Sequence, residues 1–177
     1  MDIRQAETPQ ELAQVSQLFR QYYAWLADEH GINMGYQGVE AELAGLPGYY
    51  VAPGGRLLLL FEAGEAAGCG SFRPLDGKIC ELKRMYVKPG FRGKGFGRAI
   101  AVRLLEEAII SGYEIARLDT ATFLKEAHAL YSSLGFTVVE PYYQVPEDIL
   151  KVTIFMEKWL YNDRWAGQFT AVASTCG

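Results

Sequence analysis

A basic, glycine-rich segment at residues 83–105 contains the residue types that bind phosphate groups. It holds seven basic residues and no acidic residue, whereas the rest of the chain combines 10 basic with 21 acidic residues, a formal charge of −11. This local reversal of sign indicates where an anion binds. Gly93, Gly95 and Gly97 alternate with Lys94 and Phe96, so the backbone can approach a ligand and direct successive N–H groups towards it.

A helix is predicted to begin inside this glycine turn, because apolar residues recur at helical spacing from Phe96 onward. Its positive dipole end would point towards the turn. Two other phosphate-binding motifs are excluded. A G-x-G-x-x-G fingerprint from Gly93 would need glycine where Arg98 stands, and a Walker A loop from Gly90 would need lysine where Phe96 stands.

The motif that fits is R-x-x-G-x-G, formed by Arg92, Gly95 and Gly97 after an apolar strand. An LY…GF pattern follows at residues 130–136. With these flanks, roughly residues 2–160 resemble the GNAT superfamily of acetyl-coenzyme A (acetyl-CoA)-dependent N-acetyltransferases. The resemblance implies the GNAT fold, an α/β (α+β) architecture. Its sheet is mixed, mostly antiparallel, of about seven strands, flanked by helices and splayed between strands 4 and 5.

Hydrophobic periodicity and turn residues predict an element order that matches this fold. Thr8 to Glu11 forms a capping box with proline at the first helical position, so a helix is expected from there to near Gly31. Further helices are expected at 38–44, from 96 to about 111, and at 124–134. Strands are expected at 3–6, 56–62, 66–73, 79–87, 115–119, 136–140 and 151–159. Residues 1–160 form one predicted domain, and residues 161–177, which lack periodicity, form an appendage of unknown role.

The resemblance also implies a donor site for acetyl-CoA. It assigns the pyrophosphate to backbone amides between Arg92 and Arg98, that is, to Arg92, Gly93, Lys94, Gly95, Phe96, Gly97 and Arg98. It assigns the pantetheine arm to strand-like hydrogen bonds along Met85, Tyr86 and Val87. A bulge in that strand would turn one N–H group, near Met85 or Tyr86, towards the thioester oxygen.

Two residues are implied as catalytic by their positions in the family pattern. Tyr131 stands where many members keep a general acid near the coenzyme sulfur; the alternative is an aromatic packing residue. Glu81 lies 11 residues before Arg92, the spacing of the catalytic glutamate in the histone-acetyltransferase branch. The alternatives to a catalytic role for Glu81 are an ion pair with Lys83 or Arg84, or a contact to an acceptor cation. One departure is Leu124, where many members have an asparagine that contacts the pantetheine.

Other residues that can do chemistry do not form a recognisable pattern. Cys69, Cys80 and Cys176 lack metal-ligand or disulfide spacing, and the first two are expected to be small core residues. His30 and His128 also lack such spacing, so no metal site is predicted. The aromatic residues of the first predicted helix, Tyr22, Tyr23 and Trp25, either pack in the core or line the acceptor pocket.

The resemblance and the charge balance predict an N-acetyltransferase that transfers acetyl from acetyl-CoA to a primary amine of a small molecule, by direct attack in a ternary complex. The alternatives are a protein or peptide N-acetyltransferase and a coenzyme A-binding regulatory module without turnover. The acidic remainder of the chain argues against nucleic acid. The longest apolar run, residues 57–61, is too short to span a bilayer. A cytoplasmic protein is expected, and a homodimer is left open.

Overall fold

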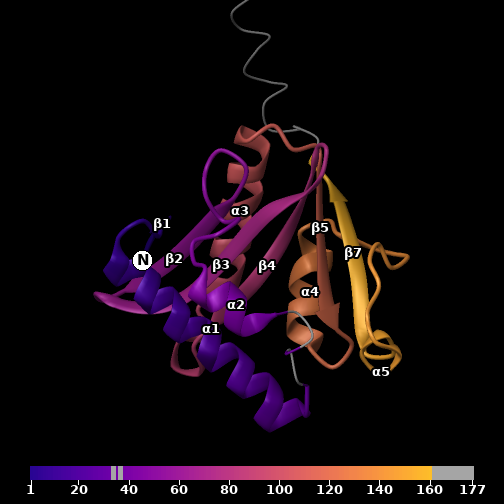
Figure 1. Cartoon of the computed structure of the whole chain (residues 1–177), viewed down its shortest axis with the longest axis horizontal. Coiled ribbons are helices and arrows are strands. Elements are labelled where there is room, and N and C mark those ends of the chain that lie inside the picture. The colour runs from indigo at the N-terminus through magenta and orange to yellow at the C-terminus, as the bar shows by residue number, and fades with distance from the viewer. Residues whose placement is uncertain (33–34, 36–37, 161–177) are drawn as a thin grey trace, which may run out of the picture.

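The computed structural model describes residues 1–32, 35 and 38–160, which form a sheet between two layers of helices. Figure 1 shows helices α1 (Pro9–His30) and α2 (Val39–Ala44) in front of the sheet. Helices α3 (Phe96–Ile110) and α4 (Lys125–Ser133) lie behind it. None of the helices in these residues is long and apolar enough to cross a membrane.

The sheet has seven strands in the order β1-β2-β3-β4-β5-β7-β6. Their bounds are β1 Asp2–Gln5, β2 Arg56–Glu62, β3 Glu65–Asp76, β4 Ile79–Val87, β5 Ile115–Ala121, β6 Thr137–Val139 and β7 Thr153–Trp159. Only β4 and β5 pair in parallel, and every other neighbouring pair is antiparallel. The predicted mixed, mostly antiparallel sheet is therefore confirmed.

The two parallel strands stay together over only a short distance. Their register runs from Ile79 opposite Ile115 to Glu81 opposite Arg117, although both strands continue well past these residues. Beyond Glu81 the strands diverge and leave an opening in the middle of the sheet. This confirms the predicted splay between strands 4 and 5.

Local sequence explains where the first helix begins and ends. The Thr8 hydroxyl accepts from the Glu11 N–H at 3.2 Å, and the Glu11 carboxylate accepts from the Thr8 N–H at 3.1 Å. This reciprocal pair satisfies donors that the first turn would leave free. Gly31 ends the helix in the left-handed conformation, with φ of 66°. The predicted helix is thus confirmed at both ends.

One short α-helix was not anticipated by the sequence pattern. Helix α5 spans Glu147–Leu150, in the stretch expected to be a loop followed directly by the last strand. Its single turn is too short to show a helical period, although Pro146 before it and two acidic residues in its first turn are typical of a helix start. The predicted appendage at 161–177, with Cys176, lies outside the described residues.

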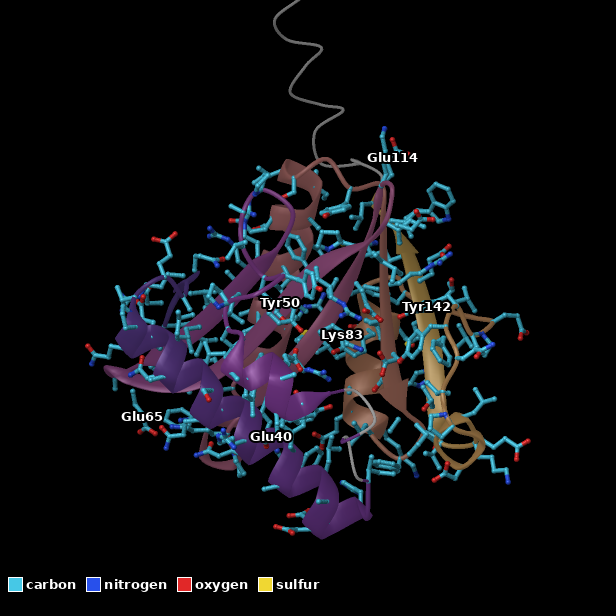
Figure 2. All side chains as sticks on the ribbon, viewed as in Figure 1. Glu40, Tyr50, Glu65, Lys83, Glu114 and Tyr142 are labelled. Atoms are coloured by element: carbon cyan, nitrogen blue, oxygen red, sulfur yellow. The ribbon has the colours of Figure 1, made fainter. Side chains whose placement is uncertain are left out.

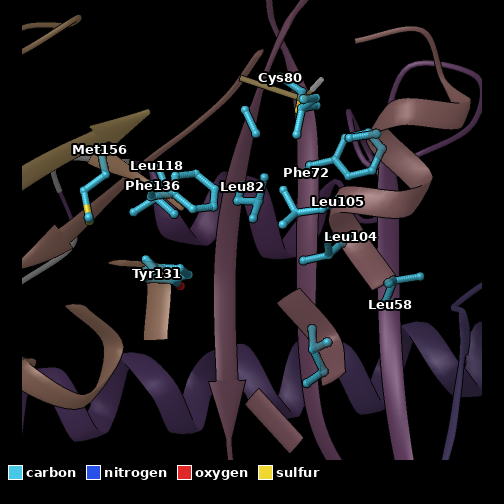
Figure 3. Close-up of a cluster of buried hydrophobic side chains, with 14 of the residues drawn as sticks. Leu58, Phe72, Cys80, Leu82, Leu104, Leu105, Leu118, Tyr131, Phe136 and Met156 are labelled. Carbon is cyan, nitrogen blue, oxygen red and sulfur yellow. The ribbon is translucent and has the colours of Figure 1, made fainter. Parts of the chain in front are cut away.

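Apolar residues pack on both faces of the sheet. Figure 3 shows the larger cluster, in which Leu82 and Leu118 of the two parallel strands lie with Leu104 of α3 and Tyr131 of α4. The other cluster joins α1 and α2 to β2 and β3 through residues such as Phe19, Leu43, Leu59 and Cys69. Cys69 and Cys80 are both fully buried, which confirms them as core residues.

Candidate active site

A cavity of about 780 Å³ lies where β4 and β5 diverge. Five segments line it: the C-terminal half of α1, residues 82–87 of β4, the glycine turn with the start of α3, the chain from the end of β5 into α4, and Ile149, Val152 and Thr153 before and at the start of β7. Segments far apart in sequence thus meet at the break in the sheet. The cavity is the candidate active site.

The glycine turn presents backbone rather than side chains to this cavity. Gly93 and Gly95 have φ of 77° and 79°, and a Cβ on either would meet no atom within 4 Å. The N–H groups in the first turn of any helix lack partners within the helix, and no side chain caps them at the start of α3. Open space beside free N–H groups at a helix N-terminus suits a phosphate group.

The basic side chains of the predicted phosphate-binding segment, residues 92–98, point in different directions. Arg92 lines the cavity, and its guanidinium lies 4.9 Å from the ring centroid of Trp25 while its Nε donates to the Val87 carbonyl at 3.1 Å. Lys94 and Arg98 do not line the cavity, and Arg98 donates to the Ser133 hydroxyl at 2.8 Å. Among residues 92–98, Arg92 is therefore the basic residue that lines the cavity.

A bulge interrupts β4 at the edge of the cavity. Cys69 pairs with Tyr86, and Ser71 pairs with Lys83, so Gly70 alone faces both Arg84 and Met85. Arg84 has φ of 58°, which is unusual for a residue with a side chain. The structure thus has an irregularity at the place where the sequence predicts an N–H group turned towards the thioester; that role stays a prediction.

Gly70 is a residue that sequence reasoning missed. A Cβ there would come within 2.6 Å of Ile100 Cγ2 and 3.1 Å of Met85 Cγ. Only glycine lets α3 pack this closely behind the bulge. The alternation of glycine with small residues in Gly68-Cys69-Gly70 was the available indication.

Tyr131 lies across the opening from the bulge. Its hydroxyl donates to the Met85 sulfur at 3.4 Å, and both residues line the cavity. Burial raises the pKa of the Tyr131 phenol above its usual value of about 10. The phenol therefore keeps its proton at neutral pH, as a general acid must. The structure brings Tyr131 together with the predicted pantetheine strand, whereas its catalytic role stays a prediction.

Glu81 does not reach the cavity. Its side chain is only 1% exposed, and its carboxylate accepts from Arg73 at 2.9 and 3.0 Å and from the Tyr142 hydroxyl at 3.1 Å. Lys83 Nζ lies 3.6 Å away. Lys83 was one of the predicted partners, but the main partner is Arg73, and Arg84 pairs elsewhere. The base role stays a prediction, and this geometry favours the alternative of a structural carboxylate.

An ion pair crosses the gap between the diverging strands. Lys83 Nζ on β4 lies 2.9 Å from the Asp119 carboxylate on β5, and both residues line the cavity. Burial acts to raise the pKa of Asp119, but the Lys83 charge and hydrogen bond hold it below its usual value. Figure 2 shows Lys83 in the central part of the molecule, between the labelled Tyr50 and Tyr142.

The sequence contains an indication of this charged face. Glu81 and Lys83 alternate with apolar residues on the predicted fourth strand, and Arg117 and Asp119 do so on the fifth. Because side chains alternate between the faces of a strand, each strand has one charged face. The Arg117 guanidinium pairs with Glu157 of β7 at 2.7 Å, which continues the row of ion pairs.

Aromatic side chains form the remaining wall. Tyr22 and Trp25 line the cavity and stack with ring centroids 6.3 Å apart, whereas Tyr23 instead donates to Glu42 at 3.1 Å. His30 stacks on Phe123 with centroids 4.2 Å apart and so joins the end of α1 to the chain after β5. Two of the three aromatic residues are therefore placed where an acceptor could meet them.

The remaining expectations from the sequence concern Leu124 and a metal site. Leu124, at the N-cap of α4, lines the cavity and makes no side-chain capping hydrogen bond. Among the described residues there is no group of three His, Cys, Asp or Glu side chains placed to hold a metal ion.

Comparisons with known proteins identify what this arrangement resembles. Residues 12–136 match the family model for the acetyltransferase (GNAT) family. The chain is 34% identical over 148 residues to the uncharacterized N-acetyltransferase C1271.07c of Schizosaccharomyces pombe, covering 82% of this chain and 88% of that protein. It is 36% identical over 138 residues to the uncharacterized N-acetyltransferase YjgM of Escherichia coli, covering 75% and 80%.

A solved structure adds a ligand to the comparison. The structure of YncA from Salmonella typhimurium with its cofactor acetyl-CoA matches with a TM-score of 0.62 and 25% identity, covering 91% of this chain and 94% of that one.

Proposed function

The chain belongs to the GNAT family of acetyltransferases, and from this premise we propose that it transfers the acetyl group of acetyl-CoA to a primary amine of a small molecule. The amine would attack the thioester directly while both substrates are bound. The observation that carries this proposal is that one cavity contains the open glycine turn, the β4 bulge and the protonated Tyr131 phenol.

The proposed donor site uses the backbone of the turn and of β4. The free N–H groups at the start of α3 would bind the pyrophosphate, and residues 85–87 would hold the pantetheine arm along the opening. YncA, which has acetyl-CoA bound and the same fold, supports this placement. The fit depends on the space beside Gly93 and Gly95, which a side chain would fill.

The transfer itself forms a nitrogen–carbon bond and breaks the carbon–sulfur bond of the thioester. The amine loses a proton, and the departing sulfur gains one. The Tyr131 hydroxyl, next to Met85, would give the proton to the sulfur, and an N–H group of the bulge would bind the thioester oxygen as it gains charge. The amine proton leaves to solvent or to Glu81, which would need a bridging water because its carboxylate lies outside the cavity.

A small acceptor is favoured by the shape and lining of the cavity. The stacked Tyr22 and Trp25 rings of α1, and the His30–Phe123 stack that joins α1 to the chain after β5, form part of its lining. A protein or peptide acceptor would need a wider groove, and a coenzyme A-binding regulatory module would have no use for a phenol against the pantetheine strand. The acidic remainder of the chain supports a neutral or cationic acceptor over a nucleic acid.

The proposal is tested by a screen of primary amines that detects thiol release from acetyl-CoA. We expect release that depends on the amine, saturates with acetyl-CoA and falls strongly in Tyr131→Phe. Binding of acetyl-CoA without thiol release for any small amine would overturn the proposal. Release with peptides alone would support the protein N-acetyltransferase instead.

A further inference from the structure

The bulge in β4 holds a conformation that its sequence does not favour. Arg84 lies in the left-handed region at φ of 58°, although it is not a glycine. This conformation is strained for a residue with a side chain and persists only when its surroundings hold it there. The bulge also carries the N–H group proposed to bind the thioester oxygen. The contacts that hold Arg84 in this conformation therefore bear on catalysis.

A carboxylate on α2 holds the Arg84 side chain. Glu42 accepts from Arg84 Nε at 3.0 and 3.1 Å and from Arg84 Nη2 at 2.7 Å. The same carboxylate accepts from the Tyr23 hydroxyl at 3.1 Å and from the Tyr50 hydroxyl. Four groups from three segments thus converge on Glu42, and its side chain is only 16% exposed against 6% for Arg84.

Both members of this pair stay charged at neutral pH. Burial acts to raise the pKa of Glu42, but the hydrogen bonds from Arg84, Tyr50 and Tyr23 and the Arg84 charge hold it below its usual value. Burial acts to lower the pKa of Arg84, and the contacts with Glu42 outweigh it and raise the pKa. A charged, doubly hydrogen-bonded pair fixes the guanidinium plane.

The main chain of the bulge is also held by side chains of β3. The Cys69 thiol lies 3.6 Å from the Arg84 carbonyl, and the Ser71 hydroxyl donates to the Lys83 carbonyl at 2.8 Å. The backbone is thus anchored before and at Arg84, while the direction of its side chain is set by Glu42.

We propose that Glu42 is a positioning residue for acetyl transfer: by fixing the Arg84 side chain it keeps Arg84 left-handed and so aims the N–H of Met85 at the thioester oxygen. The inference rests on the proposed function of the bulge. It differs from a purely structural role, in which Glu42 only attaches α2 to the sheet. A purely structural role predicts a loss of stability at unchanged kcat, whereas the positioning role predicts a loss of kcat that depends on Arg84.

The test is a double-mutant cycle with Glu42→Gln and Arg84→Gly. Glutamine keeps the shape of Glu42 but lacks its charge. Glycine adopts a positive φ without strain, so the bulge no longer needs an anchor. Loss of one oxyanion donor commonly costs about 100-fold to 1,000-fold in kcat. We expect Glu42→Gln to lower kcat about 10-fold to 100-fold, since the donor is misaimed rather than removed. The KM for acetyl-CoA should change less than about twofold, because residues 92–98 are untouched.

In the Arg84→Gly background the same Glu42→Gln change should have no effect on kcat, whatever the activity of Arg84→Gly itself. An equal loss in both backgrounds, or an unchanged kcat in Glu42→Gln alone, would overturn the inference.

A second readout does not need turnover. The amide resonance of Met85 in the ligand-free protein should shift in Glu42→Gln and should not shift when that change is made in Arg84→Gly. An unmoved resonance in Glu42→Gln would contradict the positioning role. Failure of the proposed function would instead appear in the parent protein, as acetyl-CoA binding without thiol release, and would leave the resonance test intact.

Discussion

The glycine-turn wall of the cavity presents backbone to open space, whereas the β4 wall is held in place by paired side chains. The turn at 92–98 is contiguous in sequence, and its left-handed glycines leave open space. The pairs behind β4 join residues from different elements, as in Glu42 with Arg84 and Lys83 with Asp119, and they are mostly buried.

Because of this difference, we expect mutations in one wall to affect binding and mutations in the other to affect stability or turnover. Changes at Gly93 and Gly95 should weaken acetyl-CoA binding and leave the fold intact, because a Cβ at either position would meet no atom within 4 Å. Changes among the buried pairs should leave acetyl-CoA affinity near the parent value, because they lie away from the turn. They should instead lower stability or kcat, since breaking a buried pair leaves one charge without compensation.

The largest expected effect is that of Tyr131→Phe, which removes one hydroxyl beside Met85. If the phenol protonates the leaving sulfur, kcat should fall about 100-fold to 10,000-fold while the dissociation constant of acetyl-CoA stays within about twofold. Steady-state kinetics with a calorimetric titration measure both. Full activity in this variant would return Tyr131 to a packing role.

Next in size is Lys83→Met, which leaves Asp119 without its cationic partner. Both side chains are mostly buried, so the free energy of unfolding should fall by about 3–5 kcal/mol. The folded pKa of Asp119 is lowered, so its stabilising contribution is present above its unfolded pKa, about 3.9, and is lost as the pH falls through the folded value.

Chemical denaturation from pH 7 towards pH 2 should therefore show a smaller acid-induced loss in Lys83→Met than in the parent. Lys83→Arg, which keeps the charge, is the matched control. A parent-like stability in Lys83→Met would show that the pair does not support the opening between β4 and β5.

Glu81→Gln separates the two roles left open for this residue. A structural carboxylate predicts a loss of about 1–3 kcal/mol, less than for a fully buried pair because Arg73 is 37% exposed, and a kcat within about tenfold of the parent. A general base predicts instead a deeper loss of kcat that recovers as rising pH supplies free amine. The buried position favours the first outcome, and a pH–rate profile beside a thermal melt distinguishes them.

The smallest effect is expected far from either wall, in the capping box of α1. Thr8→Ala removes the acceptor for the Glu11 N–H and should cost about 1 kcal/mol, while kcat and acetyl-CoA affinity stay unchanged. It serves as the control for stability loss without a functional effect. A change in kcat here would mean that turnover follows stability in general and would remove the contrast between the walls.

The sequence allowed prediction of those parts whose cause is local. The glycine turn, the start of α3 and the capping box each depend on residues within a few positions of one another. Helix α5 was not predicted, because a single turn is too short to show a helical period. The splay between β4 and β5 came with the family resemblance rather than from any pattern within either strand.

The buried pairs could not be predicted, because they depend on which strands and helices become neighbours. Glu42 and Arg84 are 42 positions apart, and their contact requires that α2 lie over the bulge in β4. Glu81 illustrates the same limit. Its spacing from Arg92 predicted a catalytic role, whereas in the folded chain its carboxylate pairs with Arg73. Only the alternation of charges in the two strands indicated a charged face in advance.

The central claim, that the glycine turn binds acetyl-CoA, is tested most directly at Gly95 with two variants of equal shape. Gly95→Asn and Gly95→Asp share the strain of a side chain at φ of 79°, which asparagine and aspartate tolerate better than most residues, but only aspartate adds a negative charge.

The measurement is the rise in melting temperature on adding acetyl-CoA. At about a hundred times the dissociation constant, acetyl-CoA should stabilise the parent by roughly 2.7 kcal/mol. Gly95→Asn should retain part of this rise and Gly95→Asp should lose nearly all of it. An equal rise in the parent and in Gly95→Asp would contradict the assignment of the phosphate site to this turn.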